Sequence, residues 1–213
     1  MQQWSVRAVL FDWDGTLADT CESSYRAYAR LFADLGIPFN REVFAQTYSP
    51  NWHHTYRCVG LPEERWTEAD ARWIDHFAKE TTALVKGARE ALEALAKRDV
   101  IRGIVTSGTR RRILGELKNL GVDHHFAHVV CGDDGHRRKP DPEALSKCLE
   151  HLGVAAEESA YIGDSAEDVM MARGAGVFSI GVRGTYPNHD GLVAASPDFM
   201  ADSLAHAIDH LVR

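Results

Sequence analysis

Short apolar runs alternate with amphipathic segments along most of this chain. The apolar runs have the composition of buried strands and lie at 8–11, 102–106, 128–131, 160–162 and 177–182. The segments between most of them repeat apolar positions at helical spacing, and Gly121, Gly153 and Gly176 are placed as helix stops. These helical patterns cover 88–97, 111–120, 142–152, 166–175 and 203–211. Such an alternation predicts an α/β fold with a parallel sheet.

The interval 21–86 departs from this alternation. It is rich in helix-forming and aromatic residues and has no apolar run of strand type. We therefore expect a helical subdomain at 21–86, inserted into a core formed by residues 1–20 and 87–213. Most of its aromatic side chains are assigned to packing within that subdomain. They include Tyr25, Tyr28, Phe32, Phe44, Trp52, Trp66, Trp73 and Phe77.

Length and charge narrow the class of protein. The chain has 213 residues, enough for one well-buried domain with an inserted subdomain. Lysine and arginine number 24 against 31 aspartate and glutamate, a net charge of -7. This balance argues against nonspecific binding to nucleic acid or to an anionic membrane, because both attract basic surfaces. A small anionic substrate would need a local positive site.

The cysteines and the beginning of the chain indicate a cytoplasmic protein. Cys21, Cys58, Cys131 and Cys148 are dispersed and form no Cys-x-x-Cys pair, which favours reduced thiols over disulfides or a zinc site. The first residues lack the charged and apolar regions of a signal peptide. No apolar run approaches the roughly 18 residues of a membrane helix.

The sequence Asp-Trp-Asp-Gly-Thr at 12–16 directly follows the first apolar run. Asp12 and Asp14 are two positions apart, so their side chains would converge if strand geometry continued through the turn. Two close carboxylates repel unless a proton or cation intervenes, and Mg²⁺ is a hard cation that one or two carboxylates hold. Gly15 permits a turn that a side chain would obstruct. The alternative is a solvated Asp-Gly turn without a ligand.

Three further polar patches follow in chain order, each at or just after the end of a predicted strand. They read Val-Thr-Ser-Gly-Thr at 105–109, Arg-Lys-Pro-Asp-Pro at 138–142 and Ile-Gly-Asp-Ser-Ala-Glu-Asp at 162–168. With the patch at 12–16, they resemble the four motifs of the haloacid dehalogenase superfamily of phosphohydrolases. The resemblance extends from about Val9 to about Gly184 and is greatest to the phosphoglycolate phosphatase-like branch. Ligand sites of open parallel sheets lie beyond the carboxyl ends of the strands, so all four patches should meet at one edge.

The resemblance implies a Rossmann-like core, with 21–86 as a helical cap that closes over the site. Asp12 is the candidate nucleophile, because a carboxylate can attack phosphorus to form an aspartyl-phosphate. Asp14 is the candidate general acid and base, with its backbone carbonyl rather than its side chain on Mg²⁺. A role as metal ligand only is the alternative. Asp164 should complete the metal site, while Asp168 should hold a coordinated water or orient Lys139.

Positive charge is needed because four carboxylates in one cleft would disfavour binding of a phosphate dianion. Mg²⁺ and Lys139 are expected to supply it, whereas the alternative for this lysine is a solvated surface position. Thr106, Ser107 and Gly108 would offer a hydroxyl and backbone N–H groups to phosphate near the start of a helix, or would cap that helix without a ligand. Arg110 is a candidate for a substrate carboxylate or a second phosphate.

A second cluster of metal-ligand residue types, His53, His54 and Cys58, is not favoured as a zinc site. Adjacent histidines on a helix face different directions, and a fourth ligand of the usual zinc set is missing.

The expected function is Mg²⁺-dependent hydrolysis of a small phosphorylated metabolite through an aspartyl-phosphate. Two alternatives stay open: a sugar-phosphate mutase of the same fold, and a non-catalytic binding or regulatory protein. The presence of Asp12, Asp14 and Lys139 favours an enzyme. The cap contains no motif that identifies the substrate, and the sequence does not determine the oligomeric state.

Overall fold

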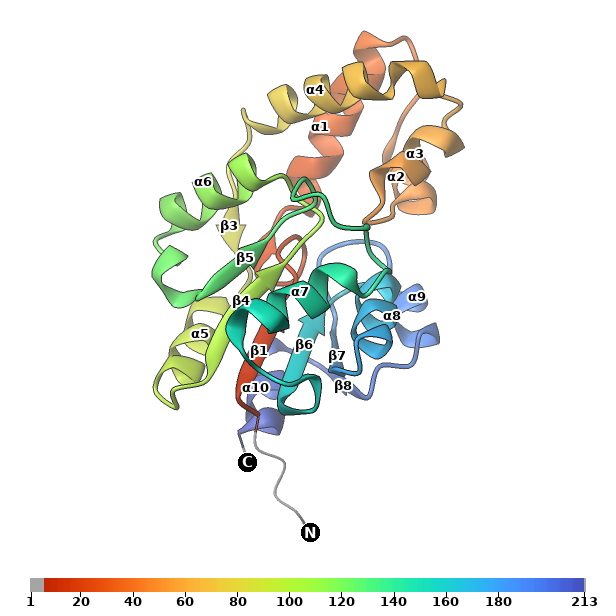
Figure 1. Cartoon of the computed structure of the whole chain (residues 1–213). Helices are drawn as coiled ribbons and strands as arrows, with labels where there is room; N and C mark the ends of the chain where they lie inside the picture. The colour runs from red at the N-terminus through yellow and green to blue at the C-terminus, as the bar shows by residue number, and fades with distance from the viewer. Residues whose placement is uncertain (1–5, 213) are drawn as a thin grey trace.

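The core of the computed structural model, which describes residues 6–212, is a six-stranded parallel sheet (Figure 1). The sequence also assigns residues 1–5 and Arg213 to the core, but these lie outside the described residues. The strand order is β5-β4-β1-β6-β7-β8. Their bounds are β1 Ala8–Phe11, β4 Ile101–Val105, β5 His128–Val130, β6 Ser159–Gly163, β7 Phe178–Val182 and β8 Phe199–Ala201. The predicted parallel α/β sheet is confirmed.

The central strand β1 lies where the direction of winding reverses. From β1 the chain passes to β4 and β5 on one side, and then to β6, β7 and β8 on the other. Ligands of open α/β sheets bind at such a switch point, outside the carboxyl ends of the strands. The residue that follows β1 is Asp12.

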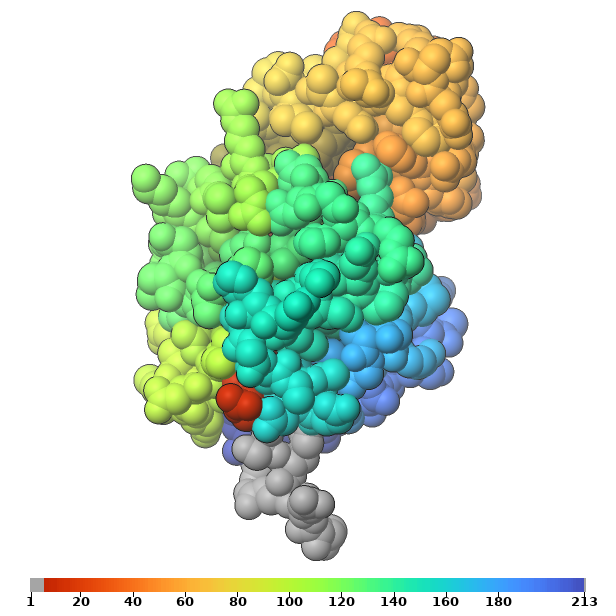
Figure 2. All heavy atoms as spheres, viewed as in Figure 1, coloured from red at the N-terminus to blue at the C-terminus, as the bar shows by residue number. Residues whose placement is uncertain are grey.

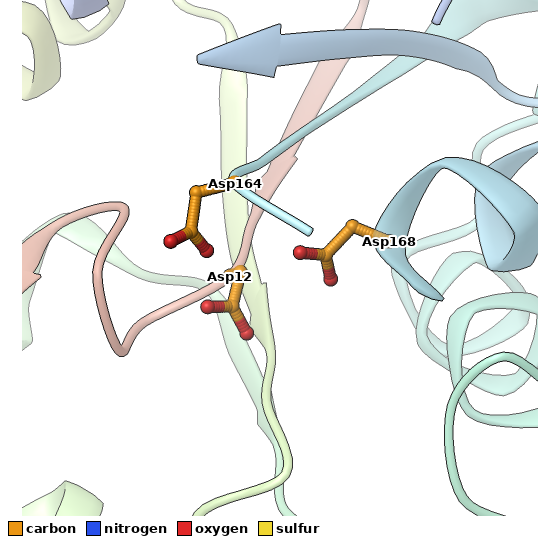
Figure 3. Close-up of side chains that lie close together, drawn as sticks. All are labelled: Asp12, Asp164 and Asp168. Atoms are coloured by element: carbon orange, nitrogen blue, oxygen red, sulfur yellow. The ribbon is translucent and has the colours of Figure 1, made fainter. Parts of the chain in front are cut away.

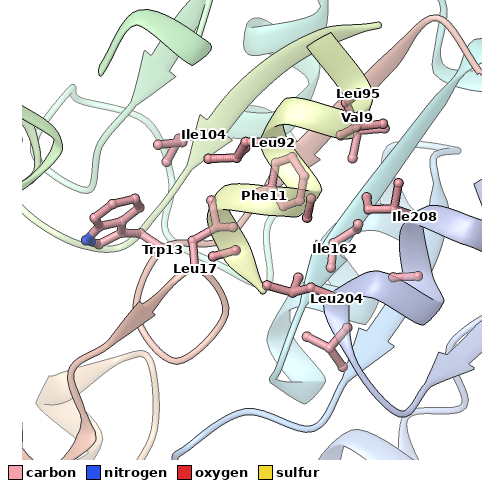
Figure 4. Packing of buried hydrophobic residues seen from close by; sticks show 14 of the residues in the cluster. Val9, Phe11, Trp13, Leu17, Leu92, Leu95, Ile104, Ile162, Leu204 and Ile208 are labelled. Atoms are coloured by element: carbon pink, nitrogen blue, oxygen red, sulfur yellow. The ribbon is translucent and has the colours of Figure 1, made fainter. Parts of the chain in front are cut away.

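Alternate residues of β1 belong to opposite faces of the sheet. Val9 and Phe11 pack in one hydrophobic cluster with Leu92 and Ile208 (Figure 4). Ala8 and Leu10 belong to a second cluster, formed with the helices α7, Glu143–Leu152, and α8, Ala166–Gly174. The sheet is therefore covered on both faces, as its apolar strands require. The core helices are α5 Ala88–Ala96, α6 Arg110–Leu120, α7 Glu143–Leu152, α8 Ala166–Gly174, α9 His189–Ala194 and α10 Leu204–Leu211, with short 3-10 helices at Asp123–His125 and Ala156–Glu158.

The edge strand β8 was not predicted. It has only three residues, too few to show a strand pattern in sequence. Its position is fixed by a neighbouring polar contact, in which the Asp198 carboxylate accepts hydrogen bonds from the backbone N–H and the hydroxyl of Ser179, at 2.8 and 2.6 Å.

The helical insert forms a separate lobe above the core (Figures 1 and 2). Its helices are α1 Cys21–Asp34, α2 Arg41–Thr47, α3 Trp52–Cys58 and α4 Trp66–Phe77, with a 3-10 helix at Glu63–Arg65. Aromatic side chains such as Tyr28, Phe32 and Phe44 fill the interior of this cap, as expected. No helix among the described residues is long and apolar enough to span a membrane.

A small antiparallel ribbon joins the cap to the core. Strand β2, Ala18–Asp19, pairs with β3, Ala83–Leu84, in the register Ala18 to Leu84 and Asp19 to Ala83. The expectation that 21–86 contains no strand is therefore wrong at its end. Two-residue strands are too short to give an alternating pattern. The ribbon brings the two chain crossings between core and cap side by side.

Candidate active site

Three buried carboxylates meet at the carboxyl edge of the sheet. Asp12 follows β1, Asp164 follows β6, and Asp168 lies in the first turn of α8. Because β1 and β6 are paired with Phe11 opposite Ile162, the two strands deliver their carboxylates to the same place. One carboxylate oxygen from each of the three residues lies within 4.8 Å of the others. Figure 3 shows the three side chains turned toward one another.

Lys139 supplies positive charge to this cluster. Its ammonium group donates hydrogen bonds to Asp12 Oδ1 at 2.6 Å, to Asp168 Oδ1 at 2.7 Å and to the Tyr161 hydroxyl at 2.7 Å. An ammonium group has three protons, so all of its donors are used. Burial alone would lower the pKa of Lys139, but Asp12 and Asp168 raise it above its ordinary value. The lysine is thus charged and held in a fixed position.

A capping box at the start of α8 fixes Asp168. Its Oδ2 accepts hydrogen bonds from the backbone N–H of Ser165 at 3.1 Å and from the Ser165 hydroxyl at 2.6 Å. Its Oδ1 accepts from Lys139 at 2.7 Å and, at 3.3 Å, from the Tyr161 hydroxyl. This is the contact expected of a residue that orients the lysine.

Asp164 has one buried oxygen, Oδ2, without a hydrogen-bond partner in the described part of the chain. Gly15, at a φ of +86°, and Gly184 lie so close to this oxygen that a Cβ atom on either would collide with it. Burial, and then the charges of Asp12 and Asp168, raise the pKa of Asp164 well above its usual range. Three carboxylates beside one ammonium group leave an excess of negative charge. One of their oxygens, Asp164 Oδ2, is also without a hydrogen-bond partner among the described residues. This arrangement fits a divalent cation.

The side chain of Asp14 points elsewhere and forms a bidentate ion pair with Arg112. The two guanidinium nitrogens donate to both carboxylate oxygens, one of them at 2.9 Å, and the Thr20 hydroxyl donates at 2.8 Å. Burial alone would raise the pKa of Asp14, but the Arg112 guanidinium lowers it below its ordinary value. Asp14 is therefore held as a carboxylate, which can accept a proton but must loosen this pair before it can donate one.

The segment from Thr106 to Gly108 forms a short loop between β4 and α6. The hydroxyl of Thr106 accepts a hydrogen bond from the backbone N–H of Gly108 at 3.1 Å. Gly132 packs against the Ser107 carbonyl so closely that a Cβ atom there would collide with it. All three loop residues line a cavity together with Asp12 and the other site carboxylates.

Arg110 is placed away from this cavity. Its guanidinium donates to the Asp134 carboxylate and to the Val129 carbonyl, the latter at 2.9 Å. The arginines that line the cavity are Arg112 and Arg138. Residues two apart on a helix face different directions, which is why Arg112 reaches Asp14 and Arg110 does not.

The histidines of α3 likewise diverge. His54 lies 3.4 Å from Cys58 Sγ, whereas the Nε2 atom of His53 faces Asp70 at 3.6 Å. Among the described residues, the one cluster with metal-ligand geometry is that of Asp12, Asp164 and Asp168.

The spacing of these residues along the chain also matches a known family. A family model described as a haloacid dehalogenase-like hydrolase matches residues 9–182, which include the carboxylates, Lys139 and the loop at Thr106 to Gly108. This chain belongs to the haloacid dehalogenase-like hydrolase family. The resemblance given by the four sequence motifs is thereby confirmed.

Several relatives of this hydrolase are named as phosphatases. A phosphoglycolate phosphatase from Yersinia pestis is 29% identical over 217 residues, covering 97% of this chain and 92% of the relative. The pyrophosphatase PpaX from Bacillus velezensis is 32% identical and covers 94% of each chain. The solved structure of CbbY from Rhodobacter sphaeroides in complex with phosphate superimposes with a TM-score of 0.79 at 24% identity, over 94% of this chain and 95% of that one. The protein is a phosphatase of this family, in the phosphoglycolate phosphatase-like branch.

The cavity of this haloacid dehalogenase-like hydrolase has a volume of about 300 Å³ and lies between core and cap. The core contributes the carboxylates, the loop at Thr106 to Gly108, and Arg112. The cap contributes side chains from α1, α3 and α4 and from the segment before α3. The carboxylate cluster of the core thus faces a separate wall built by the insert.

Three residues of the site were not found from the sequence. Arg112 is one of three consecutive arginines, of which Arg110 was the one expected from the sequence to meet a substrate anion. Tyr161, which also donates to the Val105 carbonyl at 2.7 Å, lies inside a buried strand where a tyrosine is read as packing. Tyr186 follows β7 outside any motif, yet its ring stacks on that of Tyr48 in the cap, with the two ring centres 4.1 Å apart.

Proposed function

We propose that this protein is a Mg²⁺-dependent phosphatase that hydrolyses a small phosphorylated metabolite through a phosphoryl group carried by Asp12. The observation that carries the proposal is the placement of the Asp12 carboxylate, which Lys139 holds within the acidic cluster at the floor of the cavity. The phosphatases among its relatives support a phosphate ester as substrate.

The acidic cluster fits the metal that this function requires. Asp12 and Asp164, with the backbone carbonyl of Asp14, would hold Mg²⁺, and Asp168 would act through a water or through Lys139. When bound, the cation supplies positive charge that offsets the repulsion between these carboxylates and a phosphate dianion.

The chain's own residues account for both displacements. The Asp12 carboxylate attacks phosphorus, and the bond from phosphorus to the substrate oxygen breaks as Asp14 donates to that oxygen the proton it took from water in the preceding turnover, a step for which it must loosen its pair with Arg112. Asp14 then takes a proton from a water that attacks phosphorus, which breaks the bond to Asp12 and releases inorganic phosphate. Lys139 keeps the charge on Asp12 balanced, and the loop at Thr106 to Gly108 offers the hydroxyl of Thr106 and the backbone N–H of Ser107 to the phosphate oxygens.

The test separates the roles of the two aspartates. Asp12→Asn should reduce turnover of an aryl phosphate to background, because no phosphoryl-enzyme can form. Asp14→Asn keeps the nucleophile but removes the group that activates water, so the adduct should persist. Intact-protein mass spectrometry after an acid quench should show a phosphoryl adduct on Asp12 in the Asp14 variant only. Asp209→Asn, at an exposed position of α10, is the matched control and should retain full turnover.

Normal turnover in Asp12→Asn, or an adduct on Thr106 or Ser107, would contradict the mechanism. A sugar-phosphate mutase would return the phosphoryl group to a sugar phosphate, whereas the proposed reaction releases inorganic phosphate in proportion to substrate consumed. A non-catalytic protein would hydrolyse no phosphate ester at all in the presence of Mg²⁺.

A further inference from the structure

Arg112 is shared between two carboxylates. Its guanidinium forms the bidentate pair with Asp14, and Nη1 also lies 3.2 and 3.3 Å from the two carboxylate oxygens of Glu116, one turn further along α6. The side chains of Arg112 and Glu116 are only 12% and 11% exposed. Two carboxylates therefore compete for one largely buried guanidinium group, and the shorter contacts are those to Asp14.

Glu116 is held by the residue that separates the two aspartates of the first motif. The indole N–H of Trp13, a fully buried side chain, donates to Glu116 Oε2 at 2.6 Å. Burial raises the pKa of Glu116 above its ordinary value, and Arg112 opposes this shift. In the described part of the chain, neither Trp13 nor Glu116 is among the residues that line the cavity. Glu116 thus does not face the substrate, and it reaches the site through Arg112.

The guanidinium of Arg112 has two further neighbours. Gly108 lies so close to Nη2 that a Cβ atom on this glycine would collide with it. On the cap side, the guanidinium carbon lies 4.9 Å from the centre of the Phe77 ring. Among the described residues, Asp14 and Glu116 are the carboxylates that pair with Arg112. When Asp14 is protonated, Glu116 is the anion that remains to balance this charge, and a buried charge without a partner is strongly destabilising.

We propose that Glu116 is a positioning residue of the reaction, which takes over the guanidinium of Arg112 while Asp14 carries a proton. This role rests on the phosphatase function proposed above, in which Asp14 takes a proton from water and later gives it to the leaving oxygen. As Asp14 gains the proton, Nη1 of Arg112 moves from Asp14 Oδ1 toward the Glu116 carboxylate. It returns once the proton has passed to the substrate oxygen. Arg112 and Glu116 keep their own charges throughout, so the one proton that moves is that of Asp14.

The test is the dependence of the reaction on the leaving group. p-Nitrophenyl phosphate releases a stable phenolate that leaves without a proton, whereas phenyl phosphate has a more basic leaving oxygen that requires one. The value of kcat/KM covers the steps up to the departure of this group. With Mg²⁺ present, Glu116→Gln should lower kcat/KM for phenyl phosphate by at least about tenfold, and that for p-nitrophenyl phosphate by less than about threefold.

Two further variants serve as comparisons. Glu116→Asp keeps the charge but draws it back from Arg112 by one methylene, so its selective loss on phenyl phosphate should be smaller than that of Glu116→Gln. Glu150→Gln removes a surface carboxylate that pairs with Lys147 outside the cavity, and it should leave both values unchanged. An equal loss on the two esters in Glu116→Gln, or no loss on either, would overturn the proposal. If circular dichroism shows that Glu116→Gln does not fold, the same two outcomes in Glu116→Asp decide.

The wild-type protein separates this proposal from the phosphatase function. If it hydrolyses both esters and the Glu116 variants show no selectivity for the leaving group, the role of Glu116 fails while the phosphatase function stands. Hydrolysis of p-nitrophenyl phosphate alone would mean that no acid assists the leaving group, and it would also overturn the proposal. If the wild type hydrolyses neither ester in the presence of Mg²⁺, the phosphatase function fails, and the role of Glu116 fails with it.

Discussion

Lys139→Met removes a buried charge while keeping a side chain of similar length. Asp12 and Asp168 would lose their shared cation, although their side chains are only 10% and 2% exposed. Breaking a buried ion pair by removing one partner costs about 3–5 kcal/mol, because a charge is left buried and uncompensated. For a chain of this size, 1 kcal/mol corresponds to about 2–4 °C in Tm. We therefore expect a loss of roughly 6–20 °C without divalent metal.

The loss should depend on pH. Without the lysine, Asp12 would retain a proton in the folded state to a higher pH than in the wild type, while in the unfolded chain it loses that proton near its ordinary value of 3.8. The folded state then binds more protons than the unfolded state, so the free energy of unfolding falls as pH rises. The difference in Tm between variant and wild type should be larger at pH 8 than at pH 5.

Thermal unfolding followed by circular dichroism in EDTA measures both effects. The control is Lys147→Met, because Lys147 is exposed and its ion pair with Glu150 is screened by solvent. A Tm for Lys139→Met within about 2 °C of the wild type at pH 8 would refute the reasoning, since it would mean that the three carboxylates do not depend on this charge.

Two further predictions concern Asp12 and Arg112. In the metal-free protein burial raises the pKa of Asp12 to about 7, so the free energy of unfolding should fall by up to about 4 kcal/mol between pH 4 and 7. Mg²⁺ must displace the proton on Asp12, so the affinity of the protein for Mg²⁺, measured by calorimetry, should rise as pH approaches 7. An affinity that does not change with pH would contradict this prediction. Arg112→Met should lower the free energy of unfolding measured in urea by about 3–5 kcal/mol at pH 7, because it leaves the Asp14 carboxylate without its partner. The loss should be smaller as pH falls below about 4, because Asp14 then becomes protonated. Arg111→Met, at an exposed position, should change the free energy of unfolding by under about 0.5 kcal/mol.

The residues at the carboxyl edge of the sheet could be predicted from the sequence because they directly follow the ends of strands. Asp12 and Asp164 each follow a run of buried apolar residues, and parallel strands end at one edge. A cluster of carboxylates also requires a nearby cation. Lys139 could be assigned to this role because it lies in one of the four polar patches, Arg-Lys-Pro-Asp-Pro at 138–142. The predicted core strands and helices differ from the observed ones by at most one residue at each end.

The side of the site that faces the cap could not be predicted in the same way. Asp70 and Trp52 lie on different helices, and their contact depends on how α3 and α4 pack, which no local pattern encodes. The pairing of Arg112 with Asp14 joins residues 98 positions apart and depends on the rotation of α6 about its axis. In each case the sequence shows a charged residue on an amphipathic helix, which is the ordinary appearance of a solvated face.

This difference follows from how the two halves of the cavity are built. The core must place the same few groups around a phosphoryl group whatever its alcohol part is, so residue type and spacing are both constrained along the chain. The cap is joined to the core through a two-residue ribbon and contacts such as that of Tyr186 with Tyr48, and its aromatic residues both pack inside the cap and line the cavity. A tyrosine such as Tyr28 satisfies both roles with one side chain. Its sequence position therefore identifies a core residue of the cap, and only its position in the fold shows that it also lines the cavity.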